Sequence, residues 1–309
     1  MLYTLLSHRK EAEVHFVTLK EGLQSLPQAM ASRFEEAGGK VHHDARLHEL
    51  PHPADDLVIS VRSEGGDTRL VKTRHVVLAL PRRSLALLLG RCFLFDSRQF
   101  VHDLESVTGQ AASKLFLGFR QAWWSELGLE SGRSDTDLPM RQCYYFGTEP
   151  SNDHGLLMAG YNDGRAVDFW SGFVGEKLTD SLLESRLETP PRILDELTPD
   201  SSMIEEIRRQ LSELHGIPVP APYVAYFVDW SADPYGGGWH SWKIHARSRE
   251  VMPRMRQPFK SHPVYVCGEA YSLDQGWVEG ALNTAELVLQ EKFGLAAPPY
   301  LPAGHFLGD

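Results

Sequence analysis

Cysteine is scarce in this sequence of 309 residues, which contains only Cys92, Cys143 and Cys267. The three lie far apart, form no CxxC pair and lack the spacing of zinc ligands, so the sequence predicts no structural disulfide. Four histidines fall within residues 42–52, and their surroundings fit strands and a Pro loop rather than the helix of a HExxH zinc site. We therefore expect no metal site, and the scarcity of cysteine favours a reducing, cytoplasmic location.

Long apolar runs and an excess of basic charge are missing as well. No stretch approaches the roughly 20 residues of a membrane-spanning helix, and the first ten residues lack the pattern of a signal peptide. The sequence therefore predicts neither a membrane partner nor export. With 31 basic and 41 acidic side chains, nucleic acid is not an expected partner either, because nonspecific binding needs clustered Lys and Arg.

Several motifs of large enzyme classes are also missing. The sequence contains no GxSxG elbow, no Walker A phosphate loop and no GxGxxG dinucleotide loop. Gly236–Gly238 does not qualify as the last of these, because it neither follows a βαβ-type strand nor opens a helix. The sequence therefore offers no motif for serine hydrolysis or for nucleotide phosphates.

Hydrophobic patterning predicts an α/β arrangement in the first part of the chain. A helix is expected to begin with Ser25 as its cap and to end at Gly38. The run His75–Leu80 is continuously apolar, which is typical of a strand buried on both faces. A short helix should follow at Ser84–Leu89. Strands are expected at Val14–Leu19, Val41–Leu50, Leu57–Arg62, Arg69–Val71 and His75–Leu80.

The middle of the chain has a mixed pattern, and the last part returns to α/β. Strands are expected at Lys114–Phe119, Cys143–Phe146, Leu156–Tyr161, Tyr223–Val228 and Val264–Cys267. Helices are expected at Glu176–Leu187, Ile204–Leu214 and Gly276–Gln290. We predict an α/β plus α+β fold in which a Rossmann-like domain (1–86 and 251–295) is interrupted by a mixed-sheet domain (87–250), with an irregular tail (296–309).

The most informative segment follows the last predicted strand. The strand ends at Gly268-Glu269, a loop follows, and the helix opens with glycines at 276 and 280. Unpaired N–H groups at a helix N-terminus, together with glycines that permit close approach, suit a flat or anionic ligand. Doubly wound sheets bind ligands at the carboxyl ends of their strands, where Glu269 lies. A helix packed through small residues, with Glu269 as a solvated acid, stays an alternative.

This segment resembles the C-terminal flavin-binding motif of the flavin amine oxidases, which include monoamine, polyamine and L-amino-acid oxidases. In that family a strand and Gly-Glu precede a Gly-aromatic-aliphatic-Glu-Gly-Ala run, as in Gly276–Ala281. Phe16–Pro27, Val76–Pro81 and Ser113–Phe119 resemble further family segments in the family's order. The resemblance covers about residues 14–292 and implies a partial FAD-binding domain interrupted by a substrate domain.

The resemblance implies FAD as the cofactor and amine oxidation as the reaction. Gly268 and Glu269 would contact the ribityl-diphosphate region of the flavin. The residues against the isoalloxazine ring would be Gly276, Trp277 and Val278. Lys114 would be the catalytic residue that holds a water near flavin N5 and assists reoxidation by oxygen. A lysine on the solvent face of its strand is the alternative for Lys114.

The substrate cavity implied by the resemblance involves Trp239, His240 and Trp277. L-amino-acid oxidases have tryptophan at the position of Trp277, which favours an amino-acid-type substrate. Some monoamine oxidases have Gly-Gly-Cys where this sequence has Gly237-Gly238-Trp239, and that cysteine bonds the flavin. The flavin of this chain would therefore be noncovalent. An Ω-loop with packed tryptophans stays the alternative for this segment.

The sequence departs from the family in one large respect, because family members begin with the GxGxxG segment that holds the ADP part of FAD. Three explanations stay open. The chain is one subunit of a split oxidase whose partner chain carries that half, a fragment of a longer enzyme, or a remnant that binds no flavin. The first two predict exposed apolar surface where the other half would pack.

The reaction implied by the resemblance starts from a small-molecule amine or amino acid. A hydride would pass to flavin N5, the imine would be hydrolysed, and oxygen would take the electrons to give hydrogen peroxide. Two alternatives stay open. One is a noncatalytic binding or scaffold protein that keeps the fold, and the other is a related flavin desaturase or isomerase that acts on a carbon–carbon bond.

Overall fold

The computed structural model describes residues 19, 21–53, 56–63, 65–149, 151–174, 198–302 and 305–308. The chain divides into two compact units, Met1–Leu47 with Ser60–Leu70, and His48–Ile59 with Val71–Asp309. Two predicted elements, the strand at 14–19 apart from Leu19 and the helix at 176–187, lie outside the described residues. The predicted domain limits at residues 86, 250 and 295 stay predictions.

The first unit contains the predicted helix, α2 (Ser25–Glu36), which is confirmed. The prediction that Ser25 caps this helix is wrong, because Gln24 holds the N-cap position. Ser25 Oγ instead donates to the carbonyl of Gly22 at 2.7 Å. Because the Ser25 hydroxyl bonds the carbonyl of the preceding turn, it bonds no N–H group of the helix. α2 buries none of its residues, which leaves its apolar stripe uncovered.

Three strands after α2 form a sheet in the order β1-β2-β3. Their bounds are Ala45–Glu49 (β1), Leu57–Ser63 (β2) and Thr68–Thr73 (β3). All three were predicted, and β1 is shorter than expected because Asp44 adopts a positive φ of 54°, which interrupts extended backbone before Ala45.

A two-stranded parallel sheet joins segments that are far apart in the sequence. β4 (Val76–Ala79) pairs with β12 (Val264–Cys267). The prediction that the first of these is buried on both faces is wrong, because Val77 is 45% exposed. α9 (Val278–Phe293) packs over β12 through Tyr265 and Val288.

Short helices and a β-ribbon form further parts of the second unit. The helices are α3 (Arg82–Ala86), α4 (Arg98–Leu104) and α8 (Ser248–Arg256), with 3-10 turns at Phe93–Asp96, Trp123–Leu127, Trp230–Ala232 and Glu269–Tyr271. β5 (Val107–Gln110) and β11 (Trp239–Trp242) pair antiparallel, with His240 opposite Gly109. The sequence did not predict α4, α8, β5 or β11. α8 contains Pro253, which normally argues against a helix.

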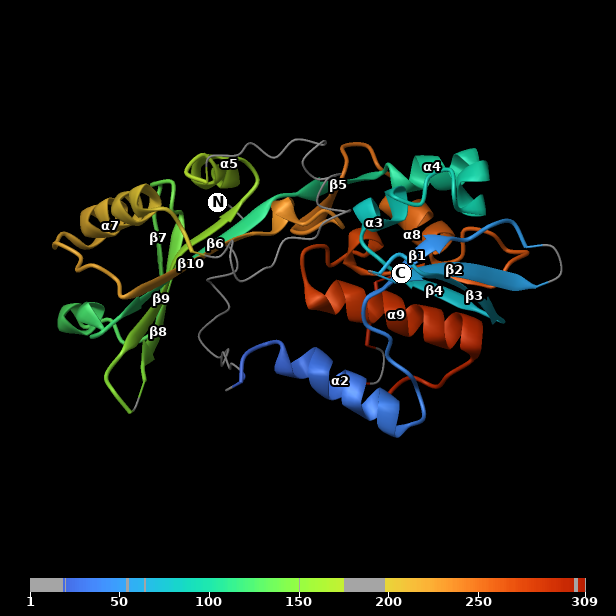
Figure 1. Ribbon diagram of the computed structural model, residues 1–309, viewed down its shortest axis with the longest axis horizontal. Helices are drawn as coiled ribbons and strands as arrows, with labels where there is room; N and C mark the ends of the chain where they lie inside the picture. The colour runs from blue at the N-terminus through green and yellow to red at the C-terminus, as the bar shows by residue number, and fades with distance from the viewer. Residues whose placement is uncertain are drawn as a thin grey trace. The chain divides into compact units, whose positions relative to one another are not determined.

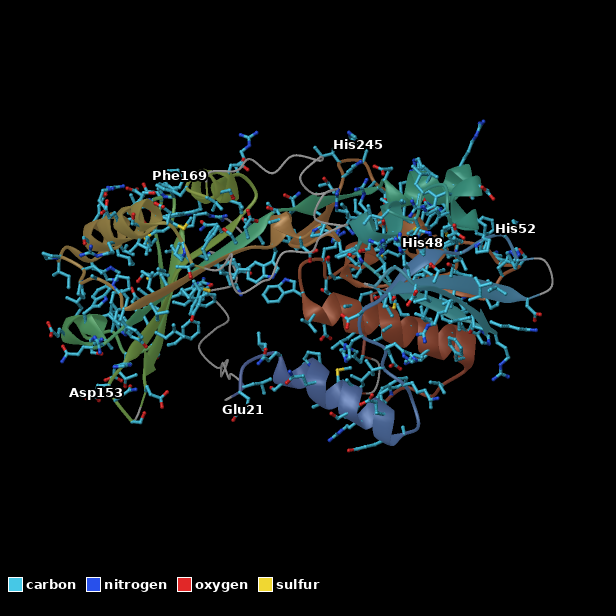
Figure 2. The ribbon with its side chains drawn as sticks, in the orientation of Figure 1. Glu21, His48, His52, Asp153, Phe169 and His245 are labelled. Atoms are coloured by element: carbon cyan, nitrogen blue, oxygen red, sulfur yellow. The ribbon has the colours of Figure 1, made fainter. Side chains whose placement is uncertain are left out.

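The middle of the chain, which belongs to the second unit, forms a five-stranded antiparallel sheet (Figure 1). In spatial order its strands are β10 (Val224–Asp229), β6 (Ala112–Phe119), β9 (Gly155–Asp163), β8 (Gln142–Thr148) and β7 (Gly132–Asp135). α7 (Ser201–His215) confirms the predicted helix and buries Ile207 and Leu211 against the sheet core. In α5 (Arg165–Ser171), the ring of Phe169 (Figure 2) lies 5.1 Å from that of Trp170. The predicted α/β plus α+β fold is confirmed.

Candidate functional site

The loop after β12 begins with a glycine whose backbone conformation most residues avoid. Gly268 has a φ of 137°, where a side chain would strain the chain. Its N–H donates to Thr284 Oγ1 on α9 at 2.9 Å, which ties the loop to the helix. The sequence reasoning missed Thr284. A polar residue on the buried face of a helix is the pattern that indicates such a role.

Glu269 closes this loop on itself. One carboxylate oxygen, Oε1, bonds Nδ1 of His240, and the other accepts the N–H of Gly276 at 2.8 Å. His240 is buried, with 6% of its side chain exposed. The alternative that Glu269 is merely a solvated acid therefore does not hold, because both oxygens have protein donors.

The start of α9 presents apolar surface beside backbone N–H groups that the N-cap side chain does not cap. Trp277 is the N-cap residue and offers no side-chain cap, so N–H groups of the first turn stay unpaired by side chains. Trp277 is 70% exposed and Val278 66%. Large apolar side chains exposed next to a helix N-terminus provide a surface that suits a flat ring with negative charge.

The two glycines of the motif allow protein atoms, rather than a ligand, to come close. A Cβ on Gly276, which has a φ of 82°, would lie 3.3 Å from the Trp239 ring. A Cβ on Gly280 would collide with Ser272 Oγ and the carbonyl of Asp274. These glycines therefore let the helix start pack against its own loop and against β11.

Lys114 lies on β6 between Tyr161 of β9 and Val228 of β10. Its Nζ is 4.8 Å from the centroid of the Tyr161 ring and 5.5 Å from that of Trp230. The side chain is half-buried, and this burial lowers the pKa of Lys114 below its ordinary value of 10.5. Lys114 is thus an ammonium held between aromatic faces.

A short segment connects Lys114 to the loop of the flavin motif. The backbone of Gly237 packs directly on the carbonyl of Trp230, so close that a Cβ there would overlap it. Two residues later, Trp239 contacts Gly276. The structure therefore brings Trp239, His240, Glu269 and Gly276 together, places Lys114 beside Trp230, and leaves Trp277 on the surface.

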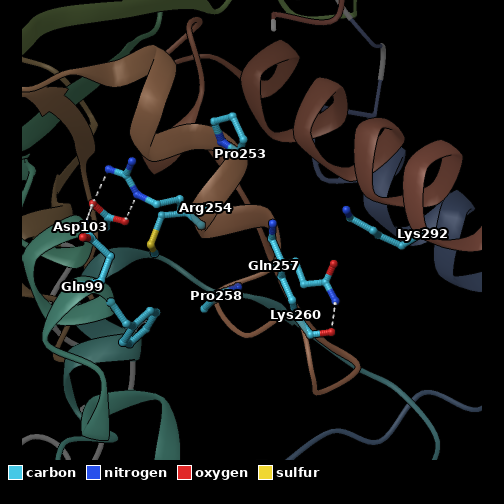
Figure 3. A pocket seen from close by; sticks show the side chains of 10 residues that line it. Gln99, Asp103, Pro253, Arg254, Gln257, Pro258, Lys260 and Lys292 are labelled. Carbon is cyan, nitrogen blue, oxygen red and sulfur yellow. Dashed lines mark hydrogen bonds and ion pairs between the residues drawn. The ribbon is translucent and has the colours of Figure 1, made fainter.

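A separate cavity of about 360 Å³ lies between α4, α8 and the end of α9 (Figure 3). Asp103 on its wall accepts bonds from Arg254 Nε at 2.6 Å and Nη2 at 2.8 Å. Burial raises the pKa of Asp103, but the bonds from Arg254 and other donors outweigh it and lower the pKa overall. Lys260, in the turn before β12, and Lys292, at the end of α9, line the cavity. These are the ends opposite to those that carry Gly268 and Trp277.

The residues present fit the ring end of a flavin. Trp277 and Val278 supply apolar surface, and the uncapped start of α9 favours negative charge. The sequence contains no glycine-rich loop for the dinucleotide end. Among the residues the structure describes, no group of three metal-ligating side chains occurs, and no helix there is long and apolar enough to cross a membrane.

Comparisons with known proteins agree with this geometry. Residues 2–288 match the family described as flavin containing amine oxidoreductase. Aplysianin-A from Aplysia kurodai is 29% identical, over 92% of this chain and 53% of its own. L-amino acid oxidase Bs29 from Bothriechis schlegelii is 22% identical, over 88% of this chain and 49% of its own.

A solved structure supports the same fold. A triple mutant of putrescine oxidase superposes with a TM-score of 0.63 at 17% identity and covers 87% of this chain and 53% of its own. The chain therefore spans about half the length of the relatives that it matches.

Proposed function

This chain belongs to the family of flavin-containing amine oxidoreductases, and from that premise we propose that it forms the flavin-ring and substrate side of an enzyme that oxidises an amine or amino acid. The feature that carries the proposal is the uncapped start of α9, where Trp277 lies exposed beside a loop fixed by Glu269. The relatives named L-amino acid oxidase support an amino acid as the substrate.

Bound flavin would supply two-electron oxidation of a carbon–nitrogen bond and pass the electrons to oxygen, giving hydrogen peroxide. The N–H groups at the start of α9 would stabilise negative charge on the ring side of the site. Trp239 and Trp277 would provide the aromatic surface that excludes water and orients the substrate. Lys114, held between Tyr161 and Trp230, would donate a hydrogen bond to a water.

We propose that the cofactor is noncovalent FAD and that a dinucleotide-binding segment, in the same protein or in a separate chain, holds its ADP part. Gly237, Gly238 and Trp239 offer no sulfur for a covalent bond. Cys92, Cys143 and Cys267 are all buried, and burial raises the pKa of each thiol, to about 11 for Cys92. A cytoplasmic location stays a prediction.

The test is an absorbance titration of the purified chain with FAD, alone and with the dinucleotide half of an L-amino acid oxidase added as a separate polypeptide. We expect flavin bands to co-elute with the chain in at least one mixture, and hydrogen peroxide to form on a panel of amino acids. Trp277→Ala should then change the substrate selectivity of that mixture. A chain that stays colourless in both mixtures would refute the proposal and favour the scaffold alternative.

A further inference from the structure

We infer that strand β11 positions the loop between β12 and α9, which we call the flavin loop. His240 and Trp242 are the positioning residues of β11. This inference deepens the proposed function and rests on it. His240 and Trp242 are two positions apart on one strand, so their side chains leave the same face. Both make hydrogen bonds to residues 269–275, the segment between β12 and α9.

His240 acts on the first residue of the segment. Its Nδ1 donates to Glu269 Oε1, and the other oxygen of the same carboxylate, Oε2, accepts the N–H of Gly276. The loop is thus closed by a carboxylate that His240 orients. Because His240 is buried, water is poorly placed to replace this donor, and its removal would leave Glu269 free to rotate.

Trp242 acts on the middle and end of the segment. Its backbone N–H donates to Gln275 Oε1 at 2.8 Å, and its indole Nε1–H donates to the carbonyl of Ser272 at 3.1 Å. Gln275 in turn donates from Nε2 to the carbonyl of Ala270 at 2.6 Å. Trp239 adds its ring contact with Gly276. β11 therefore contacts the loop at its start, middle and end, which preorganises it for a ligand.

The strand that pairs with β11 leads along the chain to Lys114. β11 pairs with β5, and a single residue, Ala111, separates β5 from β6, the strand that carries Lys114. The same ribbon therefore fixes the flavin loop through His240 and Trp242 and continues directly into the strand of the active-site lysine.

The test measures hydrogen exchange in the purified chain of 309 residues without added FAD. His240→Leu removes the donor to Glu269, whereas His240→Asn keeps an N–H near the position of Nδ1. His43→Leu makes the same change at an exposed histidine and is the matched control. We expect His240→Leu to speed exchange of the peptide 269–277 about tenfold, with peptides of α7 unchanged. His240→Asn and His43→Leu should exchange like the wild type.

A second variant covers the case in which His240→Leu does not fold. Trp242→Phe keeps an aromatic ring but removes the indole donor to Ser272, and it should raise exchange in the same peptide. FAD titration of the assembled protein should show affinity reduced about tenfold by His240→Leu and retained by His240→Asn. If His240→Leu folds and its peptide 269–277 exchanges at the wild-type rate, the inference is overturned. If only Trp242→Phe folds, a wild-type rate in that variant overturns it. Failure of the wild-type assembly to bind FAD overturns the proposed function, and the exchange result is independent of it.

Discussion

Lys114 shows how its surroundings define a residue's chemistry. On a solvent-facing strand its ammonium would be fully hydrated and would titrate normally. Here Tyr161 and Trp230 flank it, and the cost of desolvating the charge lowers its pKa. The cation–π contacts offset part of that cost, typically about 0.5–2 kcal/mol each. The neutral amine is therefore more accessible than in an ordinary lysine, while the charged form keeps aromatic partners.

This environment predicts a pH-dependent effect of Lys114→Met on stability. The unfolded chain holds the Lys114 proton up to its ordinary pKa of 10.5, whereas the folded chain releases it at lower pH. Unfolding therefore takes up a proton between the two pKa values, and the free energy of unfolding of the wild type should rise there relative to Lys114→Met. Denaturant unfolding of both proteins from pH 7 to pH 10 measures this difference. A difference that does not change with pH would contradict it.

In the flavin-loaded assembly, the same variant should slow reoxidation by oxygen without abolishing reduction by substrate. Lys114 is proposed to hold a water through its ammonium, and methionine has no such donor. Stopped-flow mixing of the reduced assembly with oxygen measures the step. Lys243→Met, at an exposed lysine, is the control. Equal reoxidation rates in wild type and Lys114→Met would remove Lys114 from this role.

The sequence predicted those parts of the candidate site that are local in the chain. Gly268, Glu269 and Gly276 stand where a strand ends and a helix begins, and that pattern is visible in a single sequence. The bond between His240 and Glu269 was not predictable, because it joins residues 29 positions apart and depends on β11 pairing with β5. Residue-level reasoning finds the groups but not their partners.

Among the elements, α7 shows why long, periodic segments are predicted most securely. Its apolar residues recur every three or four positions, so the pattern alone places Ile207 and Leu211 on the buried face. β5 and β11 have four residues each and are partly exposed, which leaves no periodic pattern. They form because each satisfies the other's backbone groups, and a single sequence does not display that pairing.

This argument predicts a contrast between two isoleucines. Ile207→Ala should lower the free energy of unfolding by about 2–5 kcal/mol, because it removes a fully buried side chain and leaves a cavity under α7. Ile244→Ala makes the same change where the side chain is 87% exposed and should alter stability by less than about 0.5 kcal/mol. Urea denaturation measures both. Similar losses in the two variants would mean that α7 does not pack on the sheet as described.

At the scale of the molecule, the notable property is that large apolar side chains are exposed together among the described residues. Leu26, Met30 and Phe34 form a stripe on α2 and are each about half exposed, and Val77 of β4 is also exposed. Soluble chains seldom leave such stripes open unless something binds them. The chain also spans about half the length of its relatives. Both observations agree with the proposal that a dinucleotide-binding segment completes the protein.

The stripe on α2 predicts how the isolated chain behaves. We expect the chain to enhance the fluorescence of a hydrophobic dye, and Met30→Glu to reduce this enhancement severalfold, because a charge in the centre of the stripe disrupts the apolar surface. Leu70→Glu, at an exposed leucine of β3 outside the stripe, is the matched control and should change little. Adding the dinucleotide half should lower dye binding by the wild type as strongly as Met30→Glu does. If dye binding is the same in Met30→Glu and the wild type, the stripe is not an accessible apolar surface, and the other half has no reason to pack there.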